Sequence, residues 1–178
     1  MVEVRGLTNA SGSDDVPEGA DAERRGLLAI VRIRSGINRD RETLDALKLL
    51  RLGRINTAVL LRASPGLDGQ IMKVKDVACW GPIEKGALIR LLARRGRLEG
   101  DRRLTEVDLK KETGYASVEA LADDLLLNKV QLTGVRGLKP FFRLMPPSTR
   151  ASRKRSGSDS GLLGDLGKGI NAVLMKML

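Results

Sequence analysis

The sequence predicts an α+β fold, with a βαβαβ core over residues 27–83 and a helical and hairpin extension behind it. Residues 27–34 show the alternation of a strand, and residues 57–61 form a short, partly β-branched apolar run. Between them, leucines recur at helical spacing. A second helix and a third strand complete the pattern before the break at Gly81-Pro82.

The first strand is predicted by alternating side chains after residue 26. Ala29, Val31 and Ile33 would share one face of this strand. Arg32 and Arg34 would lie on the other face. We therefore expect two arginines displayed on the surface of the sheet.

The next elements follow from capping and turn signals. Asp40 can cap a helix that ends near Gly53, and the run 57–61 would return beside the first strand as a βαβ unit. A turn is expected at 64–66, because serine, proline and glycine stand together there. Residues 70–75 and 77–80 then read as a short helix and a third strand.

The extension over residues 84–147 is predicted to be mainly helical. Pro82 can occupy the first turn of a helix whose buried stripe falls within 87–92. Thr105 with Asp108 resembles a capping box, and Ser117 can cap a further helix. The stretch 130–144 regains strand character and could form a hairpin.

The two ends of the chain differ from the core in composition. Residues 1–26 read as a flexible acidic N-terminal arm, because they are rich in small and acidic residues. Residues 148–178 read as a basic tail followed by an amphipathic helix at the very end. The glycine-rich stretch 161–169 would be a hinge before this helix, since it lacks the spacing of a phosphate-binding loop.

The charge of the chain favours a polyanionic partner. Lysine and arginine number 32 against 22 acids, which gives a formal charge of +10, so nucleic acid is expected first and an anionic membrane surface second. No apolar stretch reaches the roughly 20 residues that span a bilayer. The start of the chain lacks the pattern of a secretory signal, and Cys79 is the single cysteine. A cytoplasmic protein without membrane association is expected.

Enzymatic functions are disfavoured by the residue types present. Histidine is absent, which removes the commonest general acid or base and, with one cysteine, the usual transition-metal sites. The neighbours Asp123 and Asp124 would point about 100° apart on a helix and would not converge. We expect no catalytic residue, no metal site, no cofactor and no small-molecule substrate.

Arginine placement is the strongest physical signal, because a guanidinium meets phosphate oxygens with a planar fork of donors. Aromatic residues make up 2% of the chain, so recognition of RNA shape and phosphate is favoured over base stacking. For any single arginine an ordinary solvated surface remains the alternative. The tail arginines could instead form a localisation signal or a linker. Core filling is the favoured reading of Trp80 and Cys79.

Two adjoining segments carry a resemblance to a known family. The run 43–61 followed by 64–81 resembles the signature region of the L-thirty family of large-subunit ribosomal proteins, in its archaeal form. The similarity continues through 95–98, through 137–147 and into the terminal helix, so it covers roughly residues 27–178. Ser64 and Ile71 depart from the usual threonine and methionine of the pattern. The matching positions are Leu52, Arg54, Asn56, Pro65, Gly69, Lys73, Val74, Lys75, Trp80 and Gly81.

The resemblance implies a ferredoxin-like core with an archaeal C-terminal extension. It also implies a structural role on large-subunit (23S-type) rRNA close to 5S rRNA, among neighbouring large-subunit ribosomal proteins. Taking the resemblance and the arginine pattern together, the expected RNA contacts are Arg32, Arg34, Arg51, Arg54, Asn56, Lys73, Lys75, Arg94, Arg95, Arg97, Lys139, Arg143, Arg150, Arg153, Lys154 and Arg155.

Two other functions remain open at this point. A free-standing ferredoxin-like enzyme or ligand-binding domain would show a pocket with converging, perturbed acids. An assembly factor that visits RNA transiently would share the arginine surface and differ in its ratio to ribosomes. The fold type alone does not choose among these functions.

Overall fold

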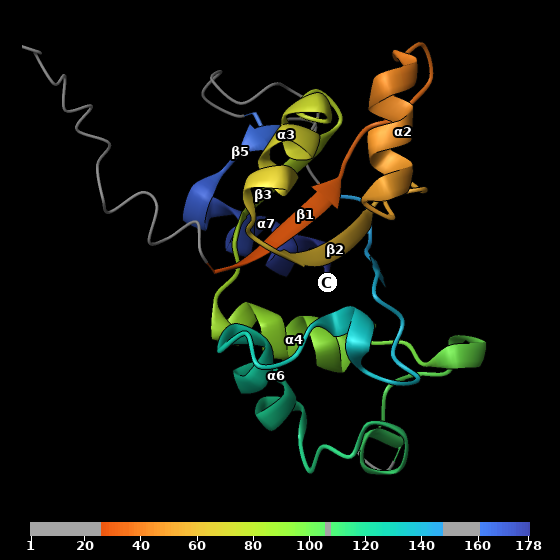
Figure 1. The fold of residues 1–178 in the computed structure, drawn as a ribbon, viewed down its shortest axis with the longest axis vertical. Helices are drawn as coiled ribbons and strands as arrows, with labels where there is room; N and C mark the ends of the chain where they lie inside the picture. The colour runs from red at the N-terminus through yellow and green to blue at the C-terminus, as the bar shows by residue number, and fades with distance from the viewer. Residues whose placement is uncertain (1–25, 106–107, 148–160) are drawn as a thin grey trace, which may run out of the picture.

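A computed structural model describes residues 26–105, 108–147 and 161–178. The chain forms a five-stranded mixed sheet in the order β4-β2-β1-β3-β5, with helices on both faces (Figure 1). The expected α+β class is confirmed. Almost all of the expected N-terminal arm, and residues 148–160 of the expected basic tail, lie outside the described residues.

Strand β1 (Leu27–Arg32) is the centre of the sheet and is buried along its whole length. It pairs antiparallel with β2 (Thr57–Arg62) on one side and with β3 (Ala78–Pro82) on the other. The expectation that one side of β1 faces solvent was therefore wrong. Its alternation reflects two buried faces, since Leu28 and Ile30 belong to a second apolar cluster.

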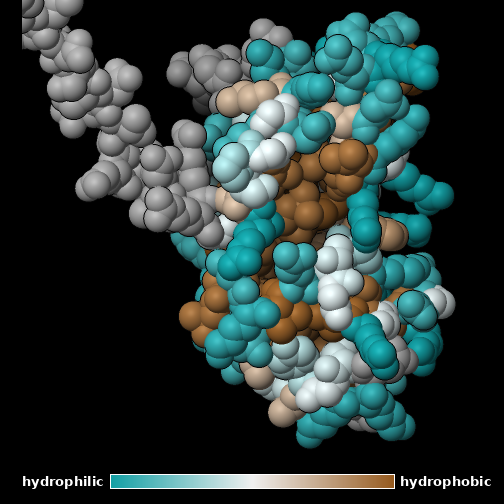
Figure 2. Space-filling model, in the orientation of Figure 1, coloured by the Kyte–Doolittle hydropathy of each residue, from teal (hydrophilic) through white to brown (hydrophobic). Residues whose placement is uncertain are grey.

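Helices α2 (Arg41–Leu49) and α3 (Pro65–Lys73) connect the three strands and cover one face of the sheet. Because β1 and β2 are antiparallel, α2 brings the chain back to the end of β1 that it left (Figure 1). The order of elements is as expected, but the connection is not the crossover of a parallel βαβ unit. Hydrophobic surface remains visible between α2 and α3 (Figure 2).

Helix α3 begins earlier than its apolar pattern indicated. Ser64 is the N-cap residue and Pro65 occupies the first turn, where the missing N–H of proline costs nothing. The expected turn at 64–66 is therefore the start of the helix. Val74 caps its end, so the helix stops before Lys75.

The second face of the sheet is covered by segments that follow β3. Helices α4 (Lys85–Arg95) and α7 (Ile170–Met177) lie on this side, α6 (Val118–Leu126) packs on α4, and all three contribute apolar side chains to one buried cluster. The stripe within residues 87–92 is buried as expected. Pro82 ends β3 opposite Leu28 instead of starting α4, which begins after the extended Glu84. The Ser117 cap is confirmed, because its Oγ accepts the N–H of Ala120 at 3.2 Å.

The rest of the extension is irregular, and the hairpin expected within 130–144 is not formed. Short 3-10 turns at Glu99–Asp101 and Leu132–Gly134, and a π turn at Leu109–Thr113, link the helices. Strand β4 (Phe142–Arg143) pairs with β2 and becomes an edge of the core sheet. Its partner is thus a strand about 85 residues earlier in the chain, beyond the reach of a local pattern.

The glycine-rich stretch before the last helix is part of the sheet, and its interpretation as a hinge was wrong. Strand β5 (Gly164–Asp165) pairs parallel with β3, and the 3-10 turn Gly167–Gly169 leads into α7. A Cβ at Gly81 would lie 2.1 Å from the carbonyl oxygen of Gly167, so glycine is what allows this close approach. The amphipathic terminal helix is confirmed.

Trp80 and Cys79 fill the core on opposite faces of β3, as expected. Burial raises the pKa of the Cys79 thiol to about 12, and its Sγ lies 3.7 Å from the carbonyl oxygen of Val31. This thiol is therefore protonated and enclosed at neutral pH.

Candidate RNA-binding surface

The antiparallel sheet brings the ends of four strands to one place. The backbone N–H of Arg34, just after β1, donates to the carbonyl oxygen of Val77, just before β3, at 3.0 Å. Asn56, just before β2, donates its N–H to Arg32 at 2.8 Å and accepts from Leu144, just after β4, at 2.8 Å. Residues that are far apart in sequence thus meet at one end of the sheet.

Several exposed side chains at this end are basic. Arg51, Arg54, Lys75 and Arg143 are exposed, and Arg34 is partly exposed. Asp76 is an acidic neighbour of this group and is itself partnered. We call this group the strand-end surface and define it as Arg34, Arg39, Arg51, Arg54, Asn56, Lys75 and Arg143.

The turn between α2 and β2 is held in an uncommon backbone conformation. Arg51 and Asn56 have φ angles of 58° and 59°, in the left-handed region. Asparagine tolerates this region better than most residues, because its short side chain can hydrogen-bond locally. The segment that carried the resemblance is therefore a shaped turn, and it presents Arg54 to solvent.

Arg32 is not part of this surface, which corrects the sequence expectation. Its side chain is 7% exposed, and its Nη1 donates to the carbonyl oxygens of Leu52 at 2.7 Å and Gly53 at 3.0 Å. Its Nε donates to the carbonyl oxygen of Arg34 at 3.0 Å. Burial lowers the pKa of this guanidinium, which stays charged. The Arg32 side chain on β1 is instead hydrogen-bonded to the turn that follows α2. It therefore stabilises the turn that carries Arg51 and Arg54.

Arg97, Lys139 and Arg143 surround one acid. Lys139 Nζ lies 2.8 Å from Asp101 Oδ1, and Arg143 Nη1 lies 3.8 Å from Asp101 Oδ2. The hydrogen bond from Lys139, with the charges of all three basic groups, holds the pKa of Asp101 below its usual value. Lys139 is therefore largely engaged by Asp101, whereas Arg143, a member of the strand-end surface, remains half-exposed.

The other residues expected to contact RNA differ in how exposed they are and in whether they already have partners within the protein. Lys73 lies 3.6 Å from Glu42, an exposed pair of small energetic weight. Arg94 is exposed on α4, while Arg95 donates to the backbone oxygen of Leu178 and has a buried Nε without a partner among the described residues. Met145 donates to Met177 at 2.8 Å, so the end of α7 beside Arg95 lies close to the strand end.

The chain enters and leaves the expected basic tail at the end of the sheet that carries the strand-end surface. Strand β4 ends there, and β5 begins there because it is parallel to β3. Residues 148–160 connect these two strands, so both of their attachment points flank the strand-end surface. Arg150, Arg153, Lys154 and Arg155 lie outside the described residues and remain predicted contacts.

Arg39 belongs to the strand-end surface and was missed by the sequence reasoning. It lies in the loop between β1 and α2 and lines a cavity with Arg34 and Asn56. A periodic pattern reveals helix and strand faces, and a loop residue has none. The available signal was only its position beside two predicted arginine-bearing elements.

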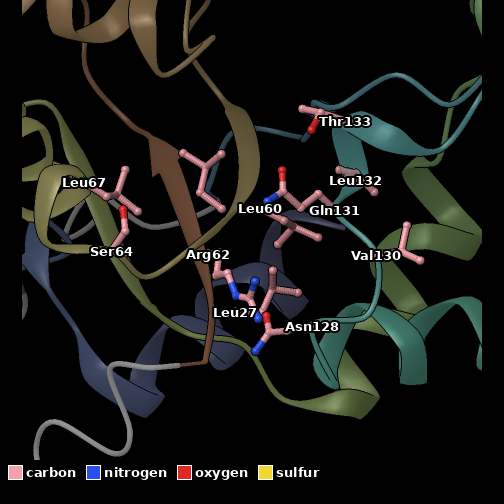
Figure 3. A pocket seen from close by; sticks show the side chains of 11 residues that line it. Leu27, Leu60, Arg62, Ser64, Leu67, Asn128, Val130, Gln131, Leu132 and Thr133 are labelled. Carbon is pink, nitrogen blue, oxygen red and sulfur yellow. The ribbon is translucent and has the colours of Figure 1, made fainter.

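The pocket in Figure 3 lies at the opposite end of β2. It has a volume of about 300 Å³, and leucines provide much of its lining. Arg62 is the one charged residue among those that line it. Among the described residues, no cluster of three or more metal-ligating side chains occurs, and no helix is long and apolar enough to cross a membrane. The residues that line this pocket therefore do not support the alternative hypothesis of a ferredoxin-like enzyme.

Fold and surface together define the class: a basic α+β protein whose antiparallel core gathers cationic side chains at one strand end. Comparison with known proteins agrees in detail. The family described as Ribosomal protein L30p/L7e matches residues 28–77, which run from β1 to the residue before β3. That segment contains most of the residues that form the strand-end surface.

Whole-length relatives extend this match. The chain is 41% identical over 155 residues to the large ribosomal subunit protein uL30 of Thermofilum pendens, covering 85% of this chain and 99% of the relative. It is 37% identical to the uL30 proteins of Methanocorpusculum labreanum and Nanoarchaeum equitans, over 152 and 155 residues, with the same coverage. The chain belongs to the uL30 family of large ribosomal subunit proteins, which confirms the resemblance seen in the sequence.

Proposed function

We propose that this protein is a structural, non-catalytic component of the large ribosomal subunit in the cytoplasm. It binds large-subunit rRNA near 5S rRNA through the strand-end surface and supports assembly of the subunit and translation. Neighbouring large-subunit proteins are its further partners. The observation that carries the proposal is the meeting of Arg34, Arg51, Arg54, Lys75 and Arg143 at one end of an antiparallel sheet.

The physical argument rests on phosphate contacts. Each phosphate neutralised by lysine or arginine releases a condensed counterion, so binding weakens steeply with salt. Exposed cations contribute little to folding, so a surface of this kind is explained better by an external polyanion. Contacts with phosphates fix the position and register of a protein on RNA without reading base sequence.

The test removes two arginines together. The double variant Arg51→Ala/Arg54→Ala should bind a transcript of the source organism's large-subunit rRNA more weakly, and should lower the slope of log K against log salt by about 2. It should also enter large subunits less efficiently, while its melting temperature changes little. Filter binding over a salt series, sucrose-gradient sedimentation and thermal unfolding measure the three quantities.

The matched control removes two cations at the opposite end of β2. Arg62 lines the pocket of Figure 3, Lys129 lies in the chain between the lining residues Asn128 and Val130, and both side chains are exposed. Arg62→Ala/Lys129→Ala makes the same change in net charge and should keep most of the affinity. Equal loss in the two double variants would show that net charge acts without a defined surface. Normal incorporation of Arg51→Ala/Arg54→Ala would refute the role assigned to the strand-end turn.

Two further measurements separate this function from its alternatives. A stoichiometric component should approach one copy per large subunit, whereas an assembly factor should be far scarcer in the same gradients. Crosslinking of the subunit-bound protein should recover 5S rRNA together with large-subunit rRNA. Recovery of large-subunit rRNA alone would remove the 5S part of the proposal.

A further inference from the structure

A second pocket opens within the strand-end surface itself. It has a volume of about 500 Å³, which falls inside the ~300–1,000 Å³ range of pockets that hold small ligands. Three segments that are distant in the sequence build it: the loop after β1, the turn before β2 and the stretch after β4. The lining residues are Ile33, Arg34, Ser35, Ile37, Arg39, Ile55, Asn56, Pro146 and Pro147.

Five of the nine lining residues of this pocket are apolar, and two of these are well exposed to solvent. Ile37 is 77% exposed and Ile55 is 47% exposed, although each could have been a polar residue at no cost to the core. Pro146 and Pro147 add rigid apolar surface on the β4 side. Exposed apolar side chains gathered at one site indicate a surface that a partner covers.

The charged residues that line the pocket indicate the charge of that partner. Arg34 and Arg39 are lining residues, and none of the nine lining residues is acidic. The exposed Arg54 adjoins Ile55 in the chain and the exposed Asp40 adjoins Arg39, so cations still outnumber acids around the pocket. An occupant must therefore combine an apolar face with a negative charge. A nucleotide has both, in its base and its phosphate.

We propose that this pocket receives one unstacked nucleotide of the rRNA. Its base lies against Ile37 and Ile55, and its phosphate lies beside Arg34 and Arg39. Proteins recognise RNA bases mainly in single-stranded segments, where the bases are splayed out and their faces and edges can be reached. Asn56, which also lines the pocket, offers both an amide donor and a carbonyl acceptor to the edge of a base.

The walls of the pocket are positioned before any ligand arrives. Asn56, next to Ile55, is held by backbone hydrogen bonds to Arg32 and Leu144, both 2.8 Å long. On the loop side, the Oγ of Ser35 accepts the N–H of Ile37 at 3.3 Å. Fixed walls reduce the entropy lost on binding, which favours specific recognition of a single nucleotide.

This inference rests on the proposed binding of rRNA and adds recognition of a base to it. The test compares Ile37→Ala/Ile55→Ala with Leu49→Ala/Leu127→Ala in the full chain. The control pair is similarly exposed, at 70% and 65%, and neither residue lines this pocket. Since three of these side chains are largely exposed and Ile55 is about half-exposed, the substitutions should leave the melting temperature within about 2 °C.

Two readouts on the large-subunit rRNA transcript separate apolar contact from charge. The pocket variant should bind roughly five- to twentyfold more weakly, because two side chains lose apolar surface that the base would cover. Its salt slope should equal that of the wild type, because losing an apolar contact releases no counterions. Protection of one unpaired base from base-modifying reagents should disappear, while hydroxyl-radical protection of the backbone persists.

The possible failures are distinct. If the wild-type chain protects neither backbone nor bases, rRNA binding itself fails. If backbone protection occurs but no base protection depends on Ile37 and Ile55, the pocket proposal is overturned and the proposed function stands. Unchanged affinity in the pocket variant would likewise overturn it, and would leave a protein neighbour as the occupant of this pocket.

Discussion

The two faces of the central sheet are covered in different ways. One face is covered by α2 and α3, which lie between the strands in sequence, and its cluster extends from Leu28 to Trp80. The other face is covered by residues that follow β3, up to Met177. The first face is local and contains the matched family segment, whereas the second depends on contacts between distant parts of the chain.

The difference explains how the strand-end surface is built. Local elements supply most of its cations, because the loop after β1 and the turn after α2 lie in the first sixty residues. The distant elements supply Arg143, the proline wall of the pocket and both attachment points of residues 148–160. We call the segments after β3 that cover the second face the second cover. Loss of these segments should therefore weaken the fold and leave the RNA-binding surface incomplete.

The largest expected effect comes from removing the last part of the second cover. Truncation after Ser160 removes β5 and α7, with the buried side chains of Leu163, Ile170, Val173, Leu174 and Met177. At roughly 1.5–3 kcal/mol for each buried side chain, the loss is about 7–15 kcal/mol, comparable to the total stability of a domain. The truncated chain should be largely unfolded when measured by circular dichroism and thermal scanning.

Two single variants calibrate this truncation. Leu174→Ala, in the buried stripe of α7, should lower the free energy of unfolding by about 2–5 kcal/mol. Lys176→Ala, on the exposed side of the same helix, should change it by less than about 0.5 kcal/mol. A truncated chain that melts at the wild-type temperature would show that the second cover is not needed for folding.

The first face is tested through its buried arginine. Arg32→Met keeps much of the apolar stem and removes the hydrogen bonds to the carbonyl oxygens of Leu52 and Gly53. The expected cost is about 1.5–3 kcal/mol, the range for hydrogen bonds to charged groups, measured by urea denaturation. Arg54→Met makes the same chemical change on the surface, where a cost below about 0.5 kcal/mol is expected.

The same two variants distinguish an arginine that supports the fold of the turn from an arginine that contacts RNA phosphate. Arg54→Met should lower the salt slope of RNA binding by about 1, because one phosphate contact is lost. Arg32→Met should weaken binding with little change in slope, since its guanidinium lies inside the protein. Equal unfolding costs for the two variants would contradict the internal role of Arg32.

The smallest expected effect concerns the close contact between β3 and the turn before α7, which we call the seam. Gly81→Ala places a Cβ 2.1 Å from the carbonyl oxygen of Gly167, so backbone must shift, at a cost of about 1–3 kcal/mol. Gly86→Ala, in α4 with nothing within 4 Å, should instead be neutral or stabilise the protein by up to about 1 kcal/mol. Chemical denaturation of both variants measures the contrast, and equal effects would mean that the seam is not tightly packed.

The sequence by itself determined the elements whose patterns are local. The leucine spacing of α2, the stripe within 87–92 and the Ser117 cap all predicted structure correctly, because a helix places residues three and four apart on one side. Similarity along most of the chain also determined the family. Alternation in β1 predicted a strand, but it could not reveal that both faces are buried, since that depends on what packs above and below.

Only the tertiary structure decided which cations face outward together. Arg32 and Arg34 are two residues apart and share a strand face in the sequence pattern, yet one is enclosed by the end of α2 and the other lines a pocket. Strand β4 falls within the stretch 130–144 that was expected to have strand character, but its pairing with β2 was not predicted, and neither was strand β5, because two residues carry no periodicity and their partners lie far away in the chain. Antiparallel pairing turns separate basic segments into one surface, and that pairing depends on long-range packing that no local pattern contains.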